Sequence, residues 1–434
     1  MSTHRKLHIG MSLAPTWLSG DGWRRENSNV EGLFGSDFAL HIARLAEAAH
    51  VDFVFRPDVS CLPMAGLESG GGFASLDPSL LLAAIARETS HVGLVSTLST
   101  TFFTPYTAAR QLQSLNWLSQ GRAGWNIVTA LQGHENFGLE AMPSADERYE
   151  RAAEFTEVVR QLWASFPHEA LKLDRATGRY ADPALIQPIE HAGRHFSVRG
   201  PLNVPAFPGP RIPLVQAGAS ATGRDFAASV ADVVFAPTPD KAAALELRQD
   251  LSRRALKHGR KAGDVRLLPG LSLYLGASRS EAHELFRDTH KRSDRARKLV
   301  VVARMLGLDL QEWPGDRPIT AADLPPPDPN PSSRTHRDLL RRLVERDSPT
   351  LDDLLMRPEV IGAAHWQVIG TVDDAVEQIA DWAAAGVMDG FLAAPGGSLD
   401  CVHLVLEQLI PQLADIGLFR KQYSGSTFAE HLGL

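Results

Sequence analysis

Short apolar runs alternate along the chain with longer segments whose apolar positions recur every three or four residues. The runs are rich in β-branched residues and are bounded by Gly, Pro and Asp, which is typical of buried parallel strands. A segment such as 36–49, with apolar residues at 38, 42, 45, 46 and 49, has the period of an amphipathic helix. Eight runs are predicted to be strands: 8–14, 53–56, 92–98, 124–129, 213–217, 233–236, 267–275 and 390–394.

This alternation predicts an α/β protein folded as a (β/α)8 TIM barrel. Such barrels exceed ~400 residues when loops are inserted, so we expect residues 1–434 to form a single domain. The spacing is broken by long insertions after strands 4 and 7, at about 131–212 and 290–365. Long connections often carry function. The second insertion contains the segment 311–331, with a Pro-rich run at 325–331, which either partly covers the barrel mouth or is an inert surface linker.

Composition excludes several classes of function. The net charge of -7, with no basic run, argues against a nucleic-acid partner. No segment approaches the ~18 apolar residues of a membrane span and no targeting segment is visible, so we expect a cytoplasmic protein without a membrane partner. The cysteines, Cys61 and Cys401, are too few for a disulfide framework. No HExxH or clustered carboxylates suggest a metal, and none is predicted.

Polar residues stand at the predicted carboxyl ends of the strands, where α/β barrels bind their ligands. Asp58 could accept a hydrogen bond from a bound ring, or it could cap the next helix. Thr97 could offer a hydroxyl to a bound ligand at the end of the third strand, or it could be an ordinary residue of a half-buried strand. Asn126 adds a carboxamide in the fourth strand. Ser220 and Gly223 begin a helix whose N-H groups could bind a phosphate, although both would also suit a turn.

Three strings in fixed order resemble a known group of enzymes. They are GRxxWNxVT at 121–129, NFG at 136–138 and RYxRAxEF at 148–155. The chain resembles the nitrilotriacetate, dibenzothiophene-sulfone and pristinamycin IIA synthase type of FMN-dependent monooxygenase, within the bacterial-luciferase-like flavin monooxygenases. Further similar segments cover essentially the whole chain: 96–119, 195–228, 267–270, 386–391 and 417–434. Such an ordered set is far more specific than any one string.

The resemblance implies a two-component monooxygenase on a TIM barrel. Reduced FMN would come from a separate NAD(P)H:flavin reductase and react with O2 to give a flavin peroxide adduct at C4a or N5. One oxygen atom would enter a small organic substrate and the other would leave as water. The absence of a Rossmann GxGxxG agrees with reduction by another protein.

The resemblance also implies where FMN binds. It places the flavin against Asp58, Thr97, Tyr149, Ser220 and position 145. Position 145 is usually His in the group but is Ala145 here, so only backbone or a neighbour such as His134 could replace that contact. Ala130 similarly replaces a common Ser. We name His134, Arg56 and Asn126 as catalytic candidates, with His365 also available, because donors stabilise developing peroxide charge. Any single His is more often an ordinary surface or satisfied residue.

The substrate and the assembly are less determined by the sequence. Few basic residues lie near the predicted mouth, which favours a neutral organosulfur or heteroaromatic substrate over a polycarboxylate. Apolar residues in the tail, Phe428, Leu432 and Leu434, predict packing across the interface of a homo-oligomer, either a dimer or a tetramer. Two alternatives remain: an F420-dependent oxidoreductase on the same barrel, which the specific strings disfavour, and a non-catalytic flavin-binding relative, which Ala130 and Ala145 make conceivable.

Overall fold

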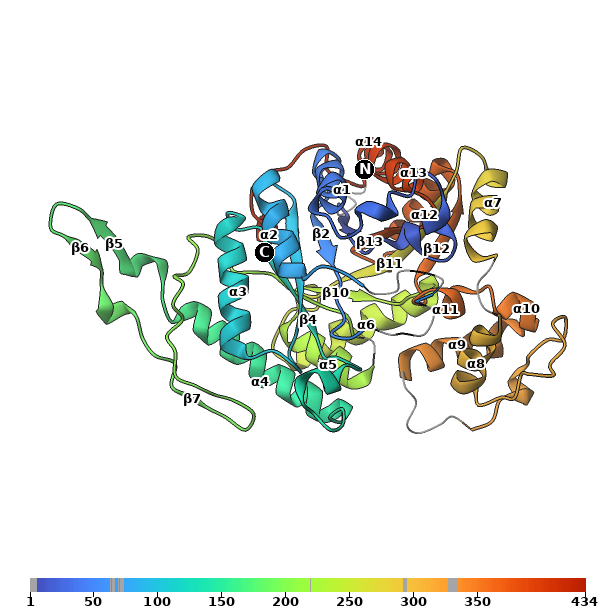
Figure 1. Ribbon diagram of the computed structural model, residues 1–434, viewed down its shortest axis with the longest axis horizontal. Coiled ribbons are helices and arrows are strands. Elements are labelled where there is room, and N and C mark those ends of the chain that lie inside the picture. The colour runs from blue at the N-terminus through green and yellow to red at the C-terminus, as the bar shows by residue number, and fades with distance from the viewer. Residues whose placement is uncertain are drawn as a thin grey trace.

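A computed structural model describes residues 6–62, 64, 67, 68, 70, 74–218, 220–291, 295–326 and 334–434. Eight parallel strands close into a barrel, with β1 paired to both β2 and β13 and β10 paired to β11 (Figure 1). The predicted TIM barrel is therefore confirmed. The barrel strands are β1 (His8–Ser12), β2 (Phe53–Arg56), β3 (Gly93–Ser99), β4 (Ala123–Val128), β9 (Leu214–Gln216), β10 (Val233–Ala236), β11 (Arg266–Leu275) and β13 (Gly390–Pro395).

A ninth parallel strand, β12 (Trp366–Gly370), was not among the predicted eight. It pairs with the second half of β11, where Leu271 lies opposite Trp366. The first half of β11 pairs instead with β10, up to the contact between Ala236 and Pro269. Because β11 is ten residues long, one strand can serve both neighbours in succession.

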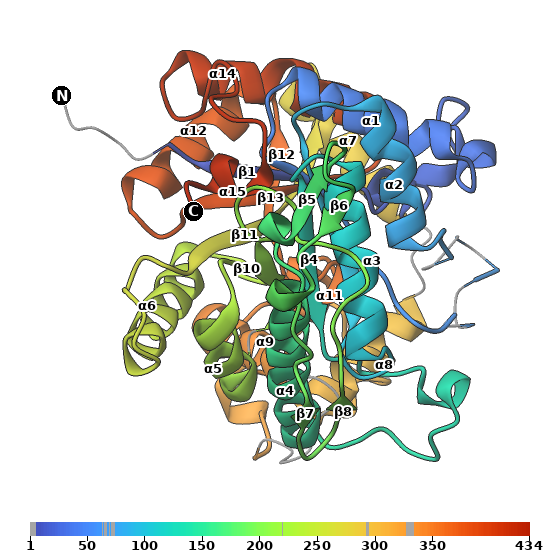
Figure 2. The same ribbon diagram turned by 90° about the vertical axis from the view of Figure 1, so that its left-hand side faces the viewer.

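Helices cover the outside of the barrel (Figures 1 and 2). Most begin with a side chain that accepts a hydrogen bond from a free N-H of the first turn, as Asp77 does for α2 and Thr371 for α12. Their apolar faces pack on the outward side chains of the strands. The covering helices are α1 (Ser36–Ala48), α2 (Pro78–Glu88), α3 (Pro105–Leu118), α4 (Ala145–Ala164), α5 (Ala221–Val230), α6 (Lys241–Lys257), α7 (Arg279–His290), α12 (Val372–Ala384), α13 (Leu399–His403) and α14 (Ile410–Asp415).

The C-terminal tail fills the amino-terminal end of the barrel. Phe428 and Leu432, on α15 (Phe428–Leu432), are 0% and 1% exposed and belong to the apolar cluster inside the barrel. The strands leave room for Phe428 at Gly93 and Gly124, where an added Cβ would lie 2.6 Å from its ring. Phe428 and Leu432 therefore pack within their own chain and not on the surface where we expected a subunit contact. The carboxyl end of the barrel is left for a ligand.

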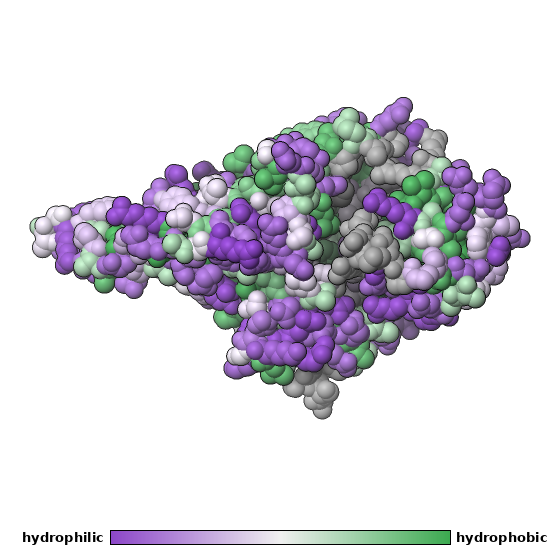
Figure 3. Space-filling view, turned by 90° about the horizontal axis from the view of Figure 1, so that it is seen from below, coloured by the Kyte–Doolittle hydropathy of each residue, from purple (hydrophilic) through white to green (hydrophobic). Residues whose placement is uncertain are grey.

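The connection between β4 and β9 first forms η4 (His134–Phe137) and α4, and then an arm of two small hairpins. Figure 1 shows this arm extending well away from the barrel, and Figure 3 shows it as a narrow, mostly hydrophilic projection with some apolar atoms among the polar ones. Its strands are β5 (Leu171–Asp174), β6 (Arg179–Ala181), β7 (His191–Ala192) and β8 (Ser197–Val198). This insertion thus projects outward from the body of the protein.

The connection between β11 and β12 contains a small helical subassembly with an apolar cluster of its own, which includes Val302, Leu340 and Leu351. Figure 1 shows it beside the barrel. Residues 327–331 of the predicted cover lie outside the described residues. After α7, the helices are α8 (Arg295–Leu306), α9 (Arg334–Asp347), α10 (Leu351–Leu354) and α11 (Pro358–Ile361).

Candidate active site

Thr97 and Asn126 meet inside the barrel above its apolar filling. Val95 belongs to the interior cluster, so Thr97, two residues further along β3, faces the same way. The Asn126 Nδ2 donates to Thr97 Oγ1 at 3.0 Å, and Thr97 Oγ1 donates to the carbonyl of Arg56 at 2.8 Å. Asn126 Oδ1 is buried without a hydrogen-bond partner, which is costly unless a ligand supplies a donor. Thr97 and Asn126, which were predicted on separate strands, thus contact each other and leave Asn126 Oδ1 as an open acceptor.

Arg56 and Asp58 stand at the carboxyl end of β2. Arg56 is 7% exposed, and its Nη1 donates to the carbonyl of Leu13 at 2.5 Å. Burial lowers the pKa of Arg56, which the nearby Asp58 opposes. Burial raises the pKa of Asp58, and a backbone hydrogen bond from Val59 acts against that rise. The N-cap of the next helix is Asp77, so Asp58 does not have the capping role that was its alternative.

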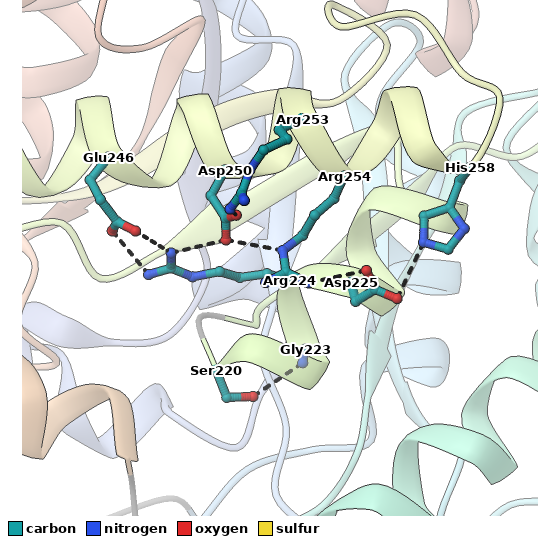
Figure 4. Close-up of polar contacts among 9 residues, drawn as sticks. All are labelled: Ser220, Gly223, Arg224, Asp225, Glu246, Asp250, Arg253, Arg254 and His258. Atoms are coloured by element: carbon teal, nitrogen blue, oxygen red, sulfur yellow. Dashed lines mark hydrogen bonds and ion pairs between the residues drawn. The ribbon is translucent and has the colours of Figure 1, made fainter.

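Tyr149, Ser220 and Gly223 converge where α4 and α5 begin. Ser220 caps α5 by accepting from the N-H of Gly223 at 3.1 Å (Figure 4). A Cβ added at Gly223 would lie 2.5 Å from the Tyr149 hydroxyl and 3.0 Å from Ser220 Oγ. The absence of a side chain at Gly223 therefore lets the Tyr149 hydroxyl lie close to the N-terminus of α5, beside Ser220 Oγ, and these three residues form the α4–α5 junction. Hydroxyl donors and the helix dipole at a helix N-terminus suit such a junction to a phosphate.

An ion-pair network holds α5 against α6 and so fixes the start of α5 at this junction. Arg224, one residue after Gly223, pairs with Glu246 and Asp250, as Figure 4 shows. Burial alone would raise the pKa of Asp250, but hydrogen bonds from three arginines lower it. The remaining pairs are Arg253 and Arg254 with Asp250, and Arg254 and His258 with Asp225.

Ala145 and His134 are the two residues considered for the flavin contact beside Tyr149. Ala145 is the first residue of α4 and brings only backbone and a methyl group to the α4–α5 junction. His134 Nδ1 lies 3.3 Å from Glu135 Oε2, without hydrogen-bond geometry. Its segment docks on the loop after β2, where Asn136 Nδ2 donates to the carbonyl of Ser60 at 2.9 Å. Among the described residues, no hydrogen bond or ion pair joins His134 to α4. That His134 replaces the missing side chain at position 145 stays a prediction.

His365 lies over the barrel wall beside β10 and β11. A Cβ added at Gly270 would lie 2.6 Å from its ring, which is 5.2 Å from the ring of Phe235. Phe235 packs against the interior cluster, so the imidazole faces the same interior. Although its surface is only partly covered, burial and then His336 lower the pKa of His365 to about 4. The imidazole is therefore neutral near pH 7.

The comparisons with known proteins decide the family. The family described as Luciferase-like monooxygenase matches residues 21–389. The chain belongs to the luciferase-like monooxygenase family. It is 33% identical to component A of a nitrilotriacetate monooxygenase of Aminobacter aminovorans, over 100% of this chain and 98% of that protein. It is 31% identical to a dibenzothiophene-sulfone monooxygenase of Rhodococcus erythropolis, with the same coverage. A solved structure, riboflavin lyase with modified FMN and riboflavin, has a TM-score of 0.83 at 27% identity and covers 99% of this chain and 96% of its own.

Membership of the luciferase-like monooxygenase family confirms the resemblance and the prediction of a two-component flavin-dependent monooxygenase. The F420-dependent alternative is not favoured. Within the part of the chain that the structure describes, no three His, Cys, Asp or Glu gather to hold a metal. No helix in the same part is long and apolar enough to cross a membrane.

Two residues of this luciferase-like monooxygenase were missed by the sequence argument. Gln216, at the end of β9, and Thr238, just beyond β10, are each 1% exposed. Gln216 Oε1 and Thr238 Oγ1 have no hydrogen-bond partner among the described residues. Both resemble ordinary strand-end residues in the sequence. A polar residue in the last position of a barrel strand, or two residues beyond it, was the available signal.

Proposed function

We propose that this protein uses reduced FMN, supplied by a separate NAD(P)H:flavin reductase, to insert one oxygen atom of O2 into a small organic substrate. The α4–α5 junction, where the hydroxyls of Tyr149 and Ser220 lie beside Gly223 at a helix N-terminus, is the observation that carries the proposal. It has the donors that a phosphate needs, at the start of a helix of ten residues. The mouth of the barrel, with the open acceptor Asn126 Oδ1, has the group that a ring N-H needs.

These residues would hold FMN at two ends. Tyr149, Ser220 and the first N-H groups of α5 would bind the phosphate, with the backbone at Ala145 as a further donor. Thr97, Asn126 and Asp58 would line the ring. Bound reduced FMN supplies the electrons that activate O2.

The chain's own groups would then orient the substrate and hold protons. His365 is neutral near pH 7, so its imidazole can accept a proton and return it. Arg56 places a buried positive charge at the end of β2, which would favour negative charge developing nearby. The rings of Phe102 and Phe137 stack with centroids 4.3 Å apart, and they would help to exclude water.

We propose a neutral substrate of the organosulfur or heteroaromatic class. The named relatives act on substrates as different as nitrilotriacetate and dibenzothiophene sulfone, so the choice depends on this chain. The guanidinium groups of Arg56 and Arg25 are each anchored on a backbone carbonyl, of Leu13 and of Gly397 at 2.8 Å, and keep their positive charge. Phe55 and Phe235 add apolar surface inside the barrel. This apolar surface is the support for a neutral ring over a polycarboxylate.

We also propose that the chain acts as one barrel domain in the cytoplasm and assembles as a homo-oligomer. The support for assembly is the arm, where Leu173 and Tyr180 are 59% and 71% exposed. Large apolar residues on a projecting segment are typical of subunit contacts.

Turnover with a purified flavin reductase, NADH, FMN and 18O2 tests the function. We expect one 18O atom in the product of a thioether or sulfone substrate, and none when FMN is omitted. Tyr149→Phe should raise the FMN concentration needed for half-maximal turnover about tenfold, since a hydrogen bond to a charged group is worth about 1.5–3 kcal/mol. Tyr180→Phe, on the exposed arm, is the matched control. Product without 18O, or equal behaviour of the two variants, would contradict the proposal.

A further inference from the structure

A cavity of about 610 Å³ lies outside the barrel, between the final turns of α3, α4 and α5 and the loop 206–212. Figure 2 faces α4, with α3 on one side and α5 on the other. The cavity adjoins Ser229 and Val230 at the C-terminal end of α5, whereas Ser220 and Gly223 stand at its N-terminal end. A ten-residue helix is about 15 Å long, so this cavity is distinct from the proposed phosphate site.

The walls of the cavity combine an apolar surface with a few fixed polar groups. Its apolar side chains come from α4, α5, the loop before β9 and the first residue of β9: Trp163, Phe207, Ile212, Leu214 and Val230. Phe207 is held edge-on against Trp117, with ring centroids 5.2 Å apart. Small-molecule sites usually have this composition and volumes of about 300–1,000 Å³.

Three arginines line the same cavity and face one buried carboxylate. Arg211 makes two hydrogen bonds with Asp232, of 2.7 and 2.6 Å, and Asp232 also accepts from the N-H of Leu214. The other two, Arg160 and Arg260, are held by carbonyls at the end of α5. Arg160 donates to Val230 at 3.1 Å, and Arg260 donates to Ala228 and Ala231 at 2.9 and 2.8 Å.

The charge balance of the cavity is therefore positive. One carboxylate, Asp232, stands against the guanidinium groups of Arg160, Arg211 and Arg260. The C-terminal end of α5 carries a partial negative charge of about one half, which offsets part of the remaining positive charge. Burial lowers the pKa of Arg160, and the like charge of Arg211 lowers it further. An anion placed among these groups would meet positive charge that the protein has already oriented.

We propose that this cavity is a second binding site, for a small organic anion whose aromatic or aliphatic body carries a carboxylate, sulfonate or phosphate. The apolar walls would hold the body, with Trp163 and Phe207 against its faces. The anionic group would lie at Arg160 and Arg260. The site goes beyond the proposed monooxygenase function, because it shares no residue with the barrel mouth.

Isothermal titration of the full-length protein with naphthalene-2-sulfonate tests this site, with naphthalene-2-sulfonamide as a neutral ligand of the same shape. We expect one saturable site per chain for the sulfonate and at least tenfold weaker binding of the sulfonamide. Arg160→Gln should weaken sulfonate binding at least tenfold. Arg110→Gln, on the exposed side of α3, is the matched control and should bind like the wild type.

Two further variants keep the test decisive. Ala164→Trp would fill the cavity from an exposed position, and it should abolish sulfonate binding while every arginine remains. Gly223→Ala would perturb only the proposed phosphate contacts at the start of α5, and it should leave sulfonate binding unchanged. Absence of wild-type binding, equal affinities of Arg160→Gln and Arg110→Gln, or loss of binding in Gly223→Ala would each overturn the proposal.

Discussion

Replacing Gly223 with Ala separates flavin binding from folding more sharply than any other single change. The new Cβ would lie 2.5 Å from the hydroxyl oxygen of Tyr149 and 3.0 Å from Ser220 Oγ. Both contacts are shorter than real Cβ atoms comfortably make, so at least the Tyr149 hydroxyl must move. That hydroxyl is the far end of a flexible side chain, which makes the movement cheap for the fold. It would not be cheap for a phosphate bound between the two oxygens.

The expected loss of affinity for FMN follows from the hydrogen-bonding groups that would be displaced. One hydrogen bond to a charged group is worth about 1.5–3 kcal/mol, which corresponds to a loss of about 10- to 150-fold in affinity for FMN. In the opposite direction, Ala in a helix is favoured over Gly by about 1 kcal/mol. We therefore expect Gly223→Ala to unfold at an unchanged or higher temperature while it binds reduced FMN at least tenfold more weakly.

Anaerobic titration with reduced FMN, together with thermal unfolding, measures both quantities. Gly263→Ala is the matched control, because an added Cβ there meets nothing within 4 Å. The control should bind like the wild type. If Gly223→Ala binds reduced FMN with wild-type affinity, the phosphate does not lie between Tyr149 and Ser220 and the reasoning fails.

Three further predictions concern stability. Glu47→Gln should lower the free energy of unfolding by about 1–3 kcal/mol in urea titrations, since its carboxylate accepts from the backbone N-H groups of residues 90–92; an unchanged midpoint would count against it. His365 has a pKa of about 4 in the folded protein and 6.5 in the unfolded chain. Its contribution to the stability of the fold is therefore complete above pH 6.5 and is lost as the pH falls from 6.5 through 4. His365→Asn should therefore be less sensitive to acid than the wild type by about 2 kcal/mol between pH 7 and 4.5, and identical slopes would refute this. Gly390→Ala would place a Cβ 1.7 Å from the carbonyl oxygen of His8, and it should lower the free energy of unfolding by about 3 kcal/mol or more. A decrease of less than about 1 kcal/mol, measured by thermal unfolding, would contradict this.

The barrel could be predicted because parallel strands that are buried on both faces form continuous apolar runs. The strand β12 was missed because its run, Trp366–Gly370, is interrupted by Gln367 and follows a loop. It is added beyond the eight strands that close the barrel. The eight strands that close the barrel could therefore be inferred from the sequence. The sequence did not show that the long strand β11 pairs along one edge with β10 first and then with β12.

The candidate site residues could be named from the sequence, but the contacts between them could not. Thr97 and Asn126 could each be assigned to a strand end, whereas their hydrogen bond depends on the register between β3 and β4. The placement of His365 over Gly270 joins segments far apart in sequence, which no local pattern encodes. The tail shows the same difficulty, because apolarity alone does not distinguish a subunit contact from the plug that Phe428 forms.

One measurement tests the central claim most directly: anaerobic titration of the purified protein with reduced FMN, compared with reduced F420, followed by mixing with O2 in the presence of a thioether or sulfone. The account predicts saturable binding of one reduced FMN per chain, no comparable binding of F420, and oxygen uptake matched by oxygenated product. Tighter binding of F420, or binding of reduced FMN without any product, would contradict it.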